Sequence, residues 1–190
     1  MTTHNPVKVP VLTSDTTFIA EPVHEETPRH LAYRYTMAAT RLALGWVFLW
    51  AFLDKTFGLG HETPSDGSWI NGGSPTEGFL ANAPTGPFAD FYKDIAGAAW
   101  ADWLFMLGLG GIGIALMLGV AMRIAAVSGA LLLVMMWSAV LPPENNPVLD
   151  DHIVYALVLG VLALAGANKT LGLGRVWERI PLVARFGFLK

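Results

Sequence analysis

Three ionisable residues occupy one of the most apolar stretches of the chain. Arg41 lies near the start of the run at residues 36–57, and Asp54 and Lys55 lie near its end. Charged groups inside an apolar segment are costly to bury, which makes them candidates for function. On a helix, Arg41 and Lys55 fall on one stripe about 20 Å apart. We therefore expect Lys55 to bind a polar headgroup, with Asp54 as its pairing partner and Arg41 as a second, inner cationic anchor.

A second polar group stands at the start of a later apolar run. Asp151, His152 and Tyr155 fall close together in the first turn of a helix that would begin there. His152 beside carboxylates is suited to proton transfer near neutral pH, and we predict Asp151, His152 and Tyr155 as the catalytic residues. An outer cluster with Lys55 would form if the two helices pack together. The alternative is an ion pair of Lys55 with Asp54 or Asp151 that only locks the helices.

The headgroup of a lipid quinone fits this set of side chains. Lys, His or Tyr would hydrogen-bond the quinone oxygens, while His152 and the carboxylates would carry protons to or from water. The chain contains no cysteine, which excludes disulfides, thiolate metal sites and iron–sulfur ligation on this chain. We expect no metal and no haem, so electrons must come through a cofactor or a partner.

Four apolar runs must position these residues: 36–57, 104–120, 124–141 and 152–167. Each is near the length that spans a membrane. Of the 190 residues, 53% are hydrophobic and 14% are charged, and the mean hydropathy is +0.47. These values indicate a polytopic membrane protein. The fold class that we predict is all-α, an integral membrane four-helix bundle, against the alternative of a soluble buried bundle, which would need polar stripes on the helices.

The positions of Lys and Arg predict the orientation, because basic segments stay in the cytoplasm during insertion. Residues 1–35 are expected to form a flexible cytoplasmic tail without a signal peptide, residues 36–167 the transmembrane domain, and residues 168–190 a basic cytoplasmic tail against anionic lipid. The acidic loop at residues 61–101 would then be extracytoplasmic, in the cytoplasmic membrane. A short amphipathic helix is predicted at 87–98, so the loop is either a simple cap or a lid over a lipid-soluble ligand. The net charge of −3 gives no reason to expect nucleic-acid binding.

The first apolar run contains Arg41-Leu42-Ala43-Leu44-Gly45-Trp46-Val47-Phe48, followed by Lys55. This pattern resembles the first helix of DoxX-type membrane proteins, with an Arg-Leu-x-Leu-Gly-x-x-Phe start and a later lysine. The wide first loop with Trp69-Ile70-Asn71-Gly72-Gly73 is most similar to the DoxD branch, named for the large subunit of a thiosulfate:quinone oxidoreductase. The resemblance covers roughly residues 35–180. It implies a multi-pass protein of the cytoplasmic membrane, linked in some members to quinone reduction with a sulfur donor and a partner subunit.

The chain departs from that family at Phe52, where relatives usually carry glycine. Its lack of cysteine also excludes sulfur transfer through a thiol of this subunit. We predict a quinone-linked oxidoreductase subunit that works with a partner membrane subunit or as a homo-oligomer. The alternative is a non-catalytic accessory or assembly subunit of a larger respiratory or envelope complex, which needs only packing faces and an ordered loop. A transporter is disfavoured, because four helices without polar residues at the midplane offer little pathway.

Overall fold

The computed structural model of the protein describes residues 8–11, 19–22 and 27–190. The chain divides into two units, Met1–Arg34 and Tyr35–Lys190. In the first unit, β1 (Lys8–Val11) pairs antiparallel with β2 (Ile19–Pro22). No strand is predicted there from the sequence. The rest of the predicted flexible tail before the first helix lies mostly outside the described residues.

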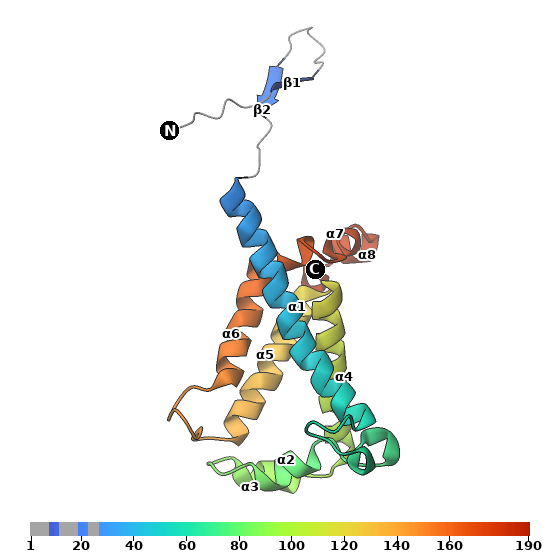
Figure 1. Cartoon of the computed structure of the whole chain (residues 1–190), viewed down its shortest axis with the longest axis vertical. Helices are drawn as coiled ribbons and strands as arrows, with labels where there is room; N and C mark the ends of the chain where they lie inside the picture. The colour runs from blue at the N-terminus through green and yellow to red at the C-terminus, as the bar shows by residue number, and fades with distance from the viewer. Residues whose placement is uncertain (1–7, 12–18, 23–26) are drawn as a thin grey trace. The chain divides into compact units, whose positions relative to one another are not determined.

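Four apolar helices confirm the predicted all-α bundle of a membrane protein. They are α1 (Pro28–Phe57), α4 (Ala99–Leu118), α5 (Met122–Ala139) and α6 (Asp151–Leu164). The first three are long and apolar enough to cross a membrane, whereas α6 has 14 residues and is shorter than a typical span. Successive helices alternate in direction along the bundle (Figure 1).

The limits of these helices follow from local chemistry. α1 begins at Pro28, well before the apolar run at 36–57, because proline at a first helical position has a suitable φ and needs no hydrogen-bonded N–H. α4 ends at Leu118, because Gly119 adopts a left-handed φ of 70°. α6 begins after Asp150, whose side chain accepts a hydrogen bond from the Ile153 amide (3.4 Å).

Small residues let the helices approach closely. A Cβ atom added at Gly113 of α4 would lie 2.7 Å from the backbone nitrogen of Leu49 in α1. A Cβ atom added at Gly129 of α5 would lie 2.7 Å from Leu159 of α6. At Gly113 the close atom belongs to the backbone, so this glycine sets the α1–α4 distance. At Gly129 it is the Cδ1 methyl of Leu159, which packs over the glycine.

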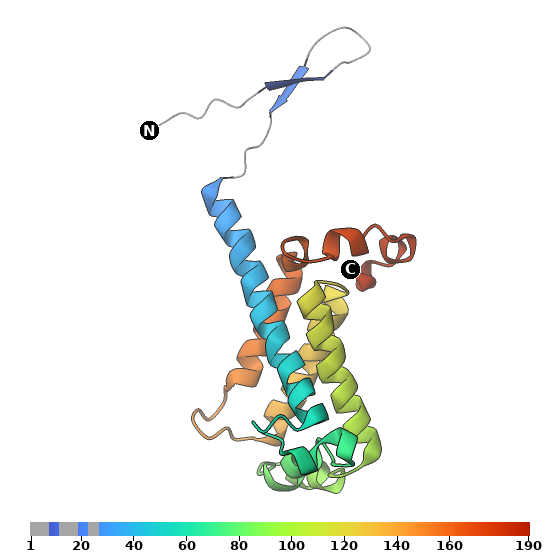
Figure 2. The same cartoon turned by 45° about the vertical axis from the view of Figure 1, so that its right-hand side comes forward.

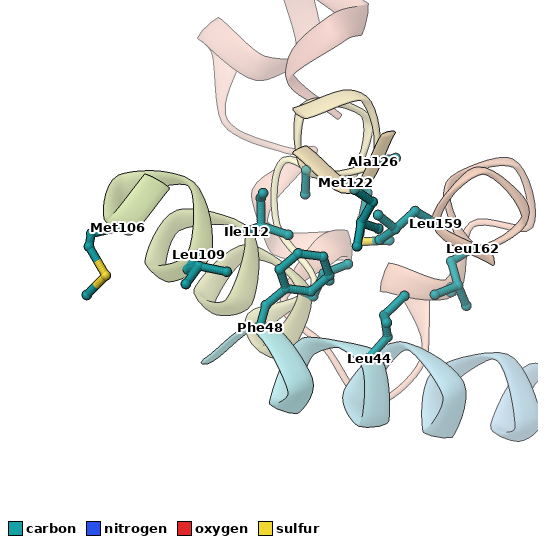
Figure 3. Close-up of a cluster of buried hydrophobic side chains, with 13 residues drawn as sticks. Leu44, Phe48, Met106, Leu109, Ile112, Met122, Ala126, Leu159 and Leu162 are labelled. Atoms are coloured by element: carbon teal, nitrogen blue, oxygen red, sulfur yellow. The ribbon is translucent and has the colours of Figure 1, made fainter. Parts of the chain in front are cut away.

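The centre of the bundle is a single cluster of buried apolar side chains drawn from all four helices. Figure 3 shows Phe48 of α1 turned toward Ile112 of α4, and Leu44 of α1 on the side of Leu159 and Leu162 of α6. Within a bilayer, packing of this kind holds helices together through close contact.

We name the two ends of the bundle by what covers them. At the loop end, the connection from α1 to α4 forms α2 (Glu77–Asn82) and α3 (Ala89–Asp94). This connection also includes two short 3-10 helices, Ser65–Gly67 and Trp69–Asn71. α3 falls within the helix predicted at 87–98, and α2 is not predicted. Figure 1 and Figure 2 both show α2 and α3 lying across this end.

The opposite end carries residues 165–190, which we call the C-terminal cap. It contains α7 (Gly174–Trp177) and α8 (Pro181–Arg185), with 3-10 helices at Ala167–Lys169 and Gly187–Leu189. The basic tail predicted at residues 168–190 includes no predicted helix. The structure instead folds this segment into an ordered cap, whose Trp177 indole donates to the Leu189 carbonyl (2.6 Å).

Candidate functional site

An apolar cavity of about 590 Å³ lies between α4 and α5 at the loop end, and it is open along one side, where Trp100, Leu104 and Leu131 are exposed. Its walls are formed by α4 and α5, with α2 and α3 closing over it and the start of α6 at its rim. Two acidic and two basic side chains line it: Glu62, Asp151, Lys55 and His152. The predicted residues Lys55, Asp151 and His152 therefore meet at one cavity, although they are separated by almost a hundred positions.

The cavity is elongated along α4 and α5, the two helices that form its walls. Along α4 the lining residues run from Trp100 to Ile112, which is about 18 Å of helix. Along α5 they run from Ser128 to Ala139, and the Ser128 hydroxyl is turned back onto the Ile124 carbonyl (2.7 Å). The deep part of the cavity is therefore apolar, and the charged groups gather at the loop end. This distribution matches an amphiphile with a polar head and an apolar chain.

Lys55 lies in the last turn of α1 and is mostly buried. Its ammonium lies 3.6 Å from Oε2 of Glu62, whose side chain is 80% exposed. The expected pair of Lys55 with Asp54 does not form in the described structure, because the Asp54 carboxylate is turned to the following loop. An exposed partner such as Glu62 holds a lysine weakly, so the Lys55 ammonium remains available to a ligand.

His152 lies in the first turn of α6 and is oriented by Asp150. Its Nδ1 atom lies 2.8 Å from Oδ2 of Asp150 and 3.6 Å from Oδ1 of Asp151. An ionised carboxylate can only accept, so Nδ1–H donates to Asp150 and Nε2 is the nitrogen left for proton exchange. The other Asp150 oxygen caps α6, so one side chain fixes both the helix start and the imidazole.

The same cluster has the donor atoms of a metal site. One ligand atom each from Asp150, Asp151 and His152 lies within 4.8 Å of the others. Asp151 is largely exposed, however, and clusters of exposed acidic groups are common without an ion. The expectation of a site without metal stays a prediction.

Tyr155 lies one turn deeper in α6 and does not line the cavity. Its side chain is half-buried and packs against the central apolar cluster. Within the described residues its hydroxyl makes no hydrogen bond to protein. The structure therefore does not bring Tyr155 together with Lys55 and His152, and its predicted catalytic role stays a prediction.

Asp54 is buried (2% exposed) and holds the loop that follows α1. Its carboxylate accepts hydrogen bonds from the backbone amides of His61 (3.3 Å), Glu62 (3.1 Å) and Thr63 (2.9 Å). Three N–H donors satisfy a buried carboxylate without a counter-ion. Asp54 thus acts on the cavity indirectly, by fixing the backbone that carries Glu62.

Arg41 is fully buried and lies at the opposite end of the bundle, near the C-terminal cap. Its guanidinium donates to the carbonyls of Leu116 and Met117 at the end of α4 and to those of Thr170 and Leu171 after α6. The last carbonyls of a helix lack partners within the helix, and a cation there also meets the negative end of the helix dipole. Arg41 therefore joins α1, α4 and the C-terminal cap, far from Lys55 and His152.

Two further side chains hold the cover of the cavity in place. Asp102 of α4 accepts hydrogen bonds from the Ser74 hydroxyl (2.9 Å) and from the amide and hydroxyl of Thr76 (3.0 and 2.6 Å). The Tyr92 hydroxyl of α3 contacts the Met135 carbonyl (3.0 Å) and the Ser138 hydroxyl (2.6 Å) of α5. Thr76 and Tyr92 both line the cavity, so these bonds fasten its roof to its walls.

Sequence reasoning does not place Glu62 at the site, and it does not decide whether Asp150 or Asp151 is the partner of His152. Glu62 is reached only after the chain turns at Gly58, which has a left-handed φ of 63°. Asp150 does have a sequence signal, because Asp directly before an apolar run is a preferred helix N-cap. Asp150 and Asp151 are equally good caps by type, however, and only the structure shows which one contacts the imidazole.

A second hollow, of about 490 Å³, lies against α1. Trp46, Trp50, His61 and Glu62 are among its lining residues, and the Trp50 and His61 rings meet edge to face with centroids 5.2 Å apart. It lacks Lys55 and His152, so the larger cavity is the better candidate site.

Comparison with known proteins gives one match. The family model described as DoxX matches residues 36–141, which include most of α1, the whole loop-end cover, α4 and α5. No curated protein and no solved structure matches the chain.

Proposed function

The chain belongs to the DoxX family of membrane proteins, and on that premise we propose that it is a quinone-binding subunit of a membrane oxidoreductase. The observation that carries the proposal is the long apolar cavity with Lys55 and His152 at its polar end. We also propose that the chain belongs to the DoxD branch of the family. Thiosulfate is then the electron donor of the complex.

The cavity fits the chemistry of a lipid quinone. Its apolar length of about 18 Å along α4 suits a hydrocarbon tail, and its charged end suits the carbonyl oxygens of a headgroup. Trp100, Phe105 and Phe79 offer flat apolar surfaces for a ring.

We assign the polar residues separate roles in this proposal. The Lys55 ammonium donates a hydrogen bond to a headgroup oxygen. His152 exchanges protons through Nε2 while Asp150 holds Nδ1, and the exposed Asp151 passes protons to water. A bound quinone, when reduced to quinol, takes up two electrons and two protons. Arg41 and Asp54, predicted as cofactor-binding residues, instead hold the fold that positions this site.

The electrons come, in this proposal, from a sulfur-containing reductant oxidised on a partner membrane subunit. A chain without cysteine offers no thiolate for that half of the reaction. If no quinone binds, the remaining proposal is a non-catalytic accessory or assembly subunit, whose partner contacts are its function.

We propose the cytoplasmic membrane as its location, with both chain termini in the cytoplasm. The support is charge: the C-terminal cap contains five basic residues and one acidic residue, whereas acidic residues dominate the loop end. Because the chain lacks cysteine, single cysteines introduced at Glu144 and at Ala184 can be tested with a membrane-impermeant thiol reagent in intact cells. Labelling at position 184 but not at 144 would show that the orientation is the opposite of the one proposed.

The function is tested by substituting the two central groups. We expect Lys55→Gln and His152→Ala each to remove quinone-dependent turnover and to weaken binding of decyl-ubiquinone, while the protein still inserts and purifies normally. Lys93→Gln, on exposed α3, and His61→Ala, in the second hollow, are matched controls that should behave like the wild type. Unchanged binding and turnover in both site variants would remove this cavity from the mechanism.

A further inference from the structure

The C-terminal cap is fastened to the bundle at two points. The Leu173 amide donates to the Leu118 carbonyl at the end of α4 (2.8 Å), and the Arg123 amide at the start of α5 donates to the Lys190 carbonyl (2.9 Å). The Arg41 guanidinium adds its contacts to the start of the cap. The cap is therefore held at the level where α4 ends and α5 begins.

Large apolar side chains of the cap lie on its outside. Val183 of α8 is buried (2% exposed), so one face of that helix packs inward. Between 52% and 64% of the surface is exposed at each of Leu171, Leu173, Val176, Leu182 and Phe188. Exposed apolar side chains gathered in one short segment mark a surface that meets another apolar phase.

The same segment carries positive charge without matching negative charge. Its single acidic residue, Glu178, pairs with Lys169 (4.0 Å) and accepts from the Asn168 amide (3.1 Å). Arg175, Arg179 and Arg185 are exposed and form no ion pair within the described part of the chain. An apolar surface mixed with unpaired arginines is complementary to anionic headgroups above acyl chains.

The position of the cap fits that environment. In Figure 1 and Figure 2, α7 and α8 run across the direction of the long helices and extend sideways past α4. A segment lying crosswise at the end of membrane-spanning helices is at the depth of the headgroups, where amphipathic elements lie in the plane of the bilayer.

We propose that the C-terminal cap is an interfacial platform that binds the anionic lipid of the surrounding bilayer. Leu182 and Phe188 enter the upper acyl region, and the three arginines contact lipid phosphates. The cap thereby sets how deeply the bundle sits. This surface lies at the opposite end from the cavity, so it is independent of any quinone site.

The absence of cysteine makes the platform testable in the full-length protein. Nitroxide labels at Leu182→Cys and Phe188→Cys are compared with a label at Glu144→Cys, an exposed position at the loop end. The protein is reconstituted in phosphatidylcholine vesicles with and without phosphatidylglycerol. We expect the two cap labels to collide with oxygen and to be shielded from a water-soluble nickel chelate, and the control label to show the reverse.

The charge contribution is measured separately. Spin-labelled phosphatidylglycerol and phosphatidylcholine report the relative association constants for the two lipids at the protein surface. Replacing Arg175, Arg179 and Arg185 by Gln should lower the preference for the anionic lipid toward the value for the zwitterionic lipid. Arg123 is left intact, because it holds the cap through the Gly187 carbonyl (2.9 Å).

Three results would overturn the proposal. Cap labels open to the nickel chelate in both vesicle types would show that the surface faces water. Spin–spin broadening between labels on two copies would show that a second copy of the chain covers it. An unchanged lipid preference in the triple variant would show that the three arginines do not contact the lipid phosphates.

Discussion

Filling the cavity from one glycine is the sharpest test of the proposed site. Gly108 of α4 lines the cavity, and a Cβ atom added there would meet only Leu132 Cδ2, at an ordinary 3.5 Å. Gly108→Leu therefore adds a side chain that the helix accepts and that has only the cavity to occupy. Gly111, one turn further along, has nothing within 4 Å of an added Cβ atom and is exposed. Gly111→Leu is thus a matched control.

The expected loss can be worked out from the space that the leucine takes. Its four side-chain carbons would project into the cavity of about 590 Å³. A lipid-soluble tail comes from the bilayer rather than from water, so the loss is one of room and packing contacts, and inserting extra methylenes into a filled apolar site costs about 1–3 kcal/mol. That corresponds to a dissociation constant roughly 5- to 150-fold higher.

The assay is titration of decyl-ubiquinone into protein held in lipid nanodiscs, followed by quenching of tryptophan fluorescence, with empty nanodiscs as the blank. Trp100 lines the cavity and so reports on its occupancy. Gly111→Leu should bind like the wild type. Equal affinities for the two leucine variants would refute the assignment of the cavity as the ligand site, and no binding by the wild type would refute the quinone itself.

Three further predictions concern the groups that hold the structure. Arg41→Met leaves buried carbonyls at the end of α4 and in the C-terminal cap without donors, which should lower the free energy of unfolding by about 3 kcal/mol in an SDS titration. A variant as stable as the wild type would show that Arg41 does not join these segments. Asp54→Ala removes the acceptor of three amides, which should lower the free energy of local opening at residues 61–63 by about 2 kcal/mol. Hydrogen exchange of these amides should then be roughly 30-fold faster, while exchange of the α5 amides stays unchanged. Tyr92→Phe removes only a hydroxyl that bonds two groups of α5, and should cost about 1 kcal/mol in the same SDS titration; no change would mean that α3 is not fastened there.

The fold was largely predictable because its signals are local. Each long apolar run produced one helix. Its ends shift by one or two residues where Gly119 or Asp150 sets the boundary, and by eight residues at Pro28. α2 and the ordered C-terminal cap were not predictable in the same way. Their short helices are held by hydrogen bonds to distant segments, and apolar periodicity contains no trace of such bonds.

The candidate site was predictable in its residue types but not in its pairings. Lys55 and His152 stand out because charge and imidazole are costly beside apolar runs, and they do reach one cavity. Arg41 stands out for the same reason, yet its donors are directed to backbone carbonyls. The sequence does not distinguish a buried cation that donates to backbone carbonyls from one that binds a ligand. Every residue has a backbone carbonyl, so these acceptors leave no mark in the residue types.

The span between Arg41 and its partners also affects how the chain is made. The Leu171 carbonyl lies 130 positions after Arg41, so at 5–20 residues per second the ribosome needs roughly 6–26 s to synthesise it. Until then α1 is in the translocon or the bilayer with part of its guanidinium unsatisfied. Completion of the C-terminus therefore acts as the last assembly step of the first helix. Nascent chains truncated before residue 170 should be recognised by membrane quality-control proteases, even though all four apolar helices have already been synthesised.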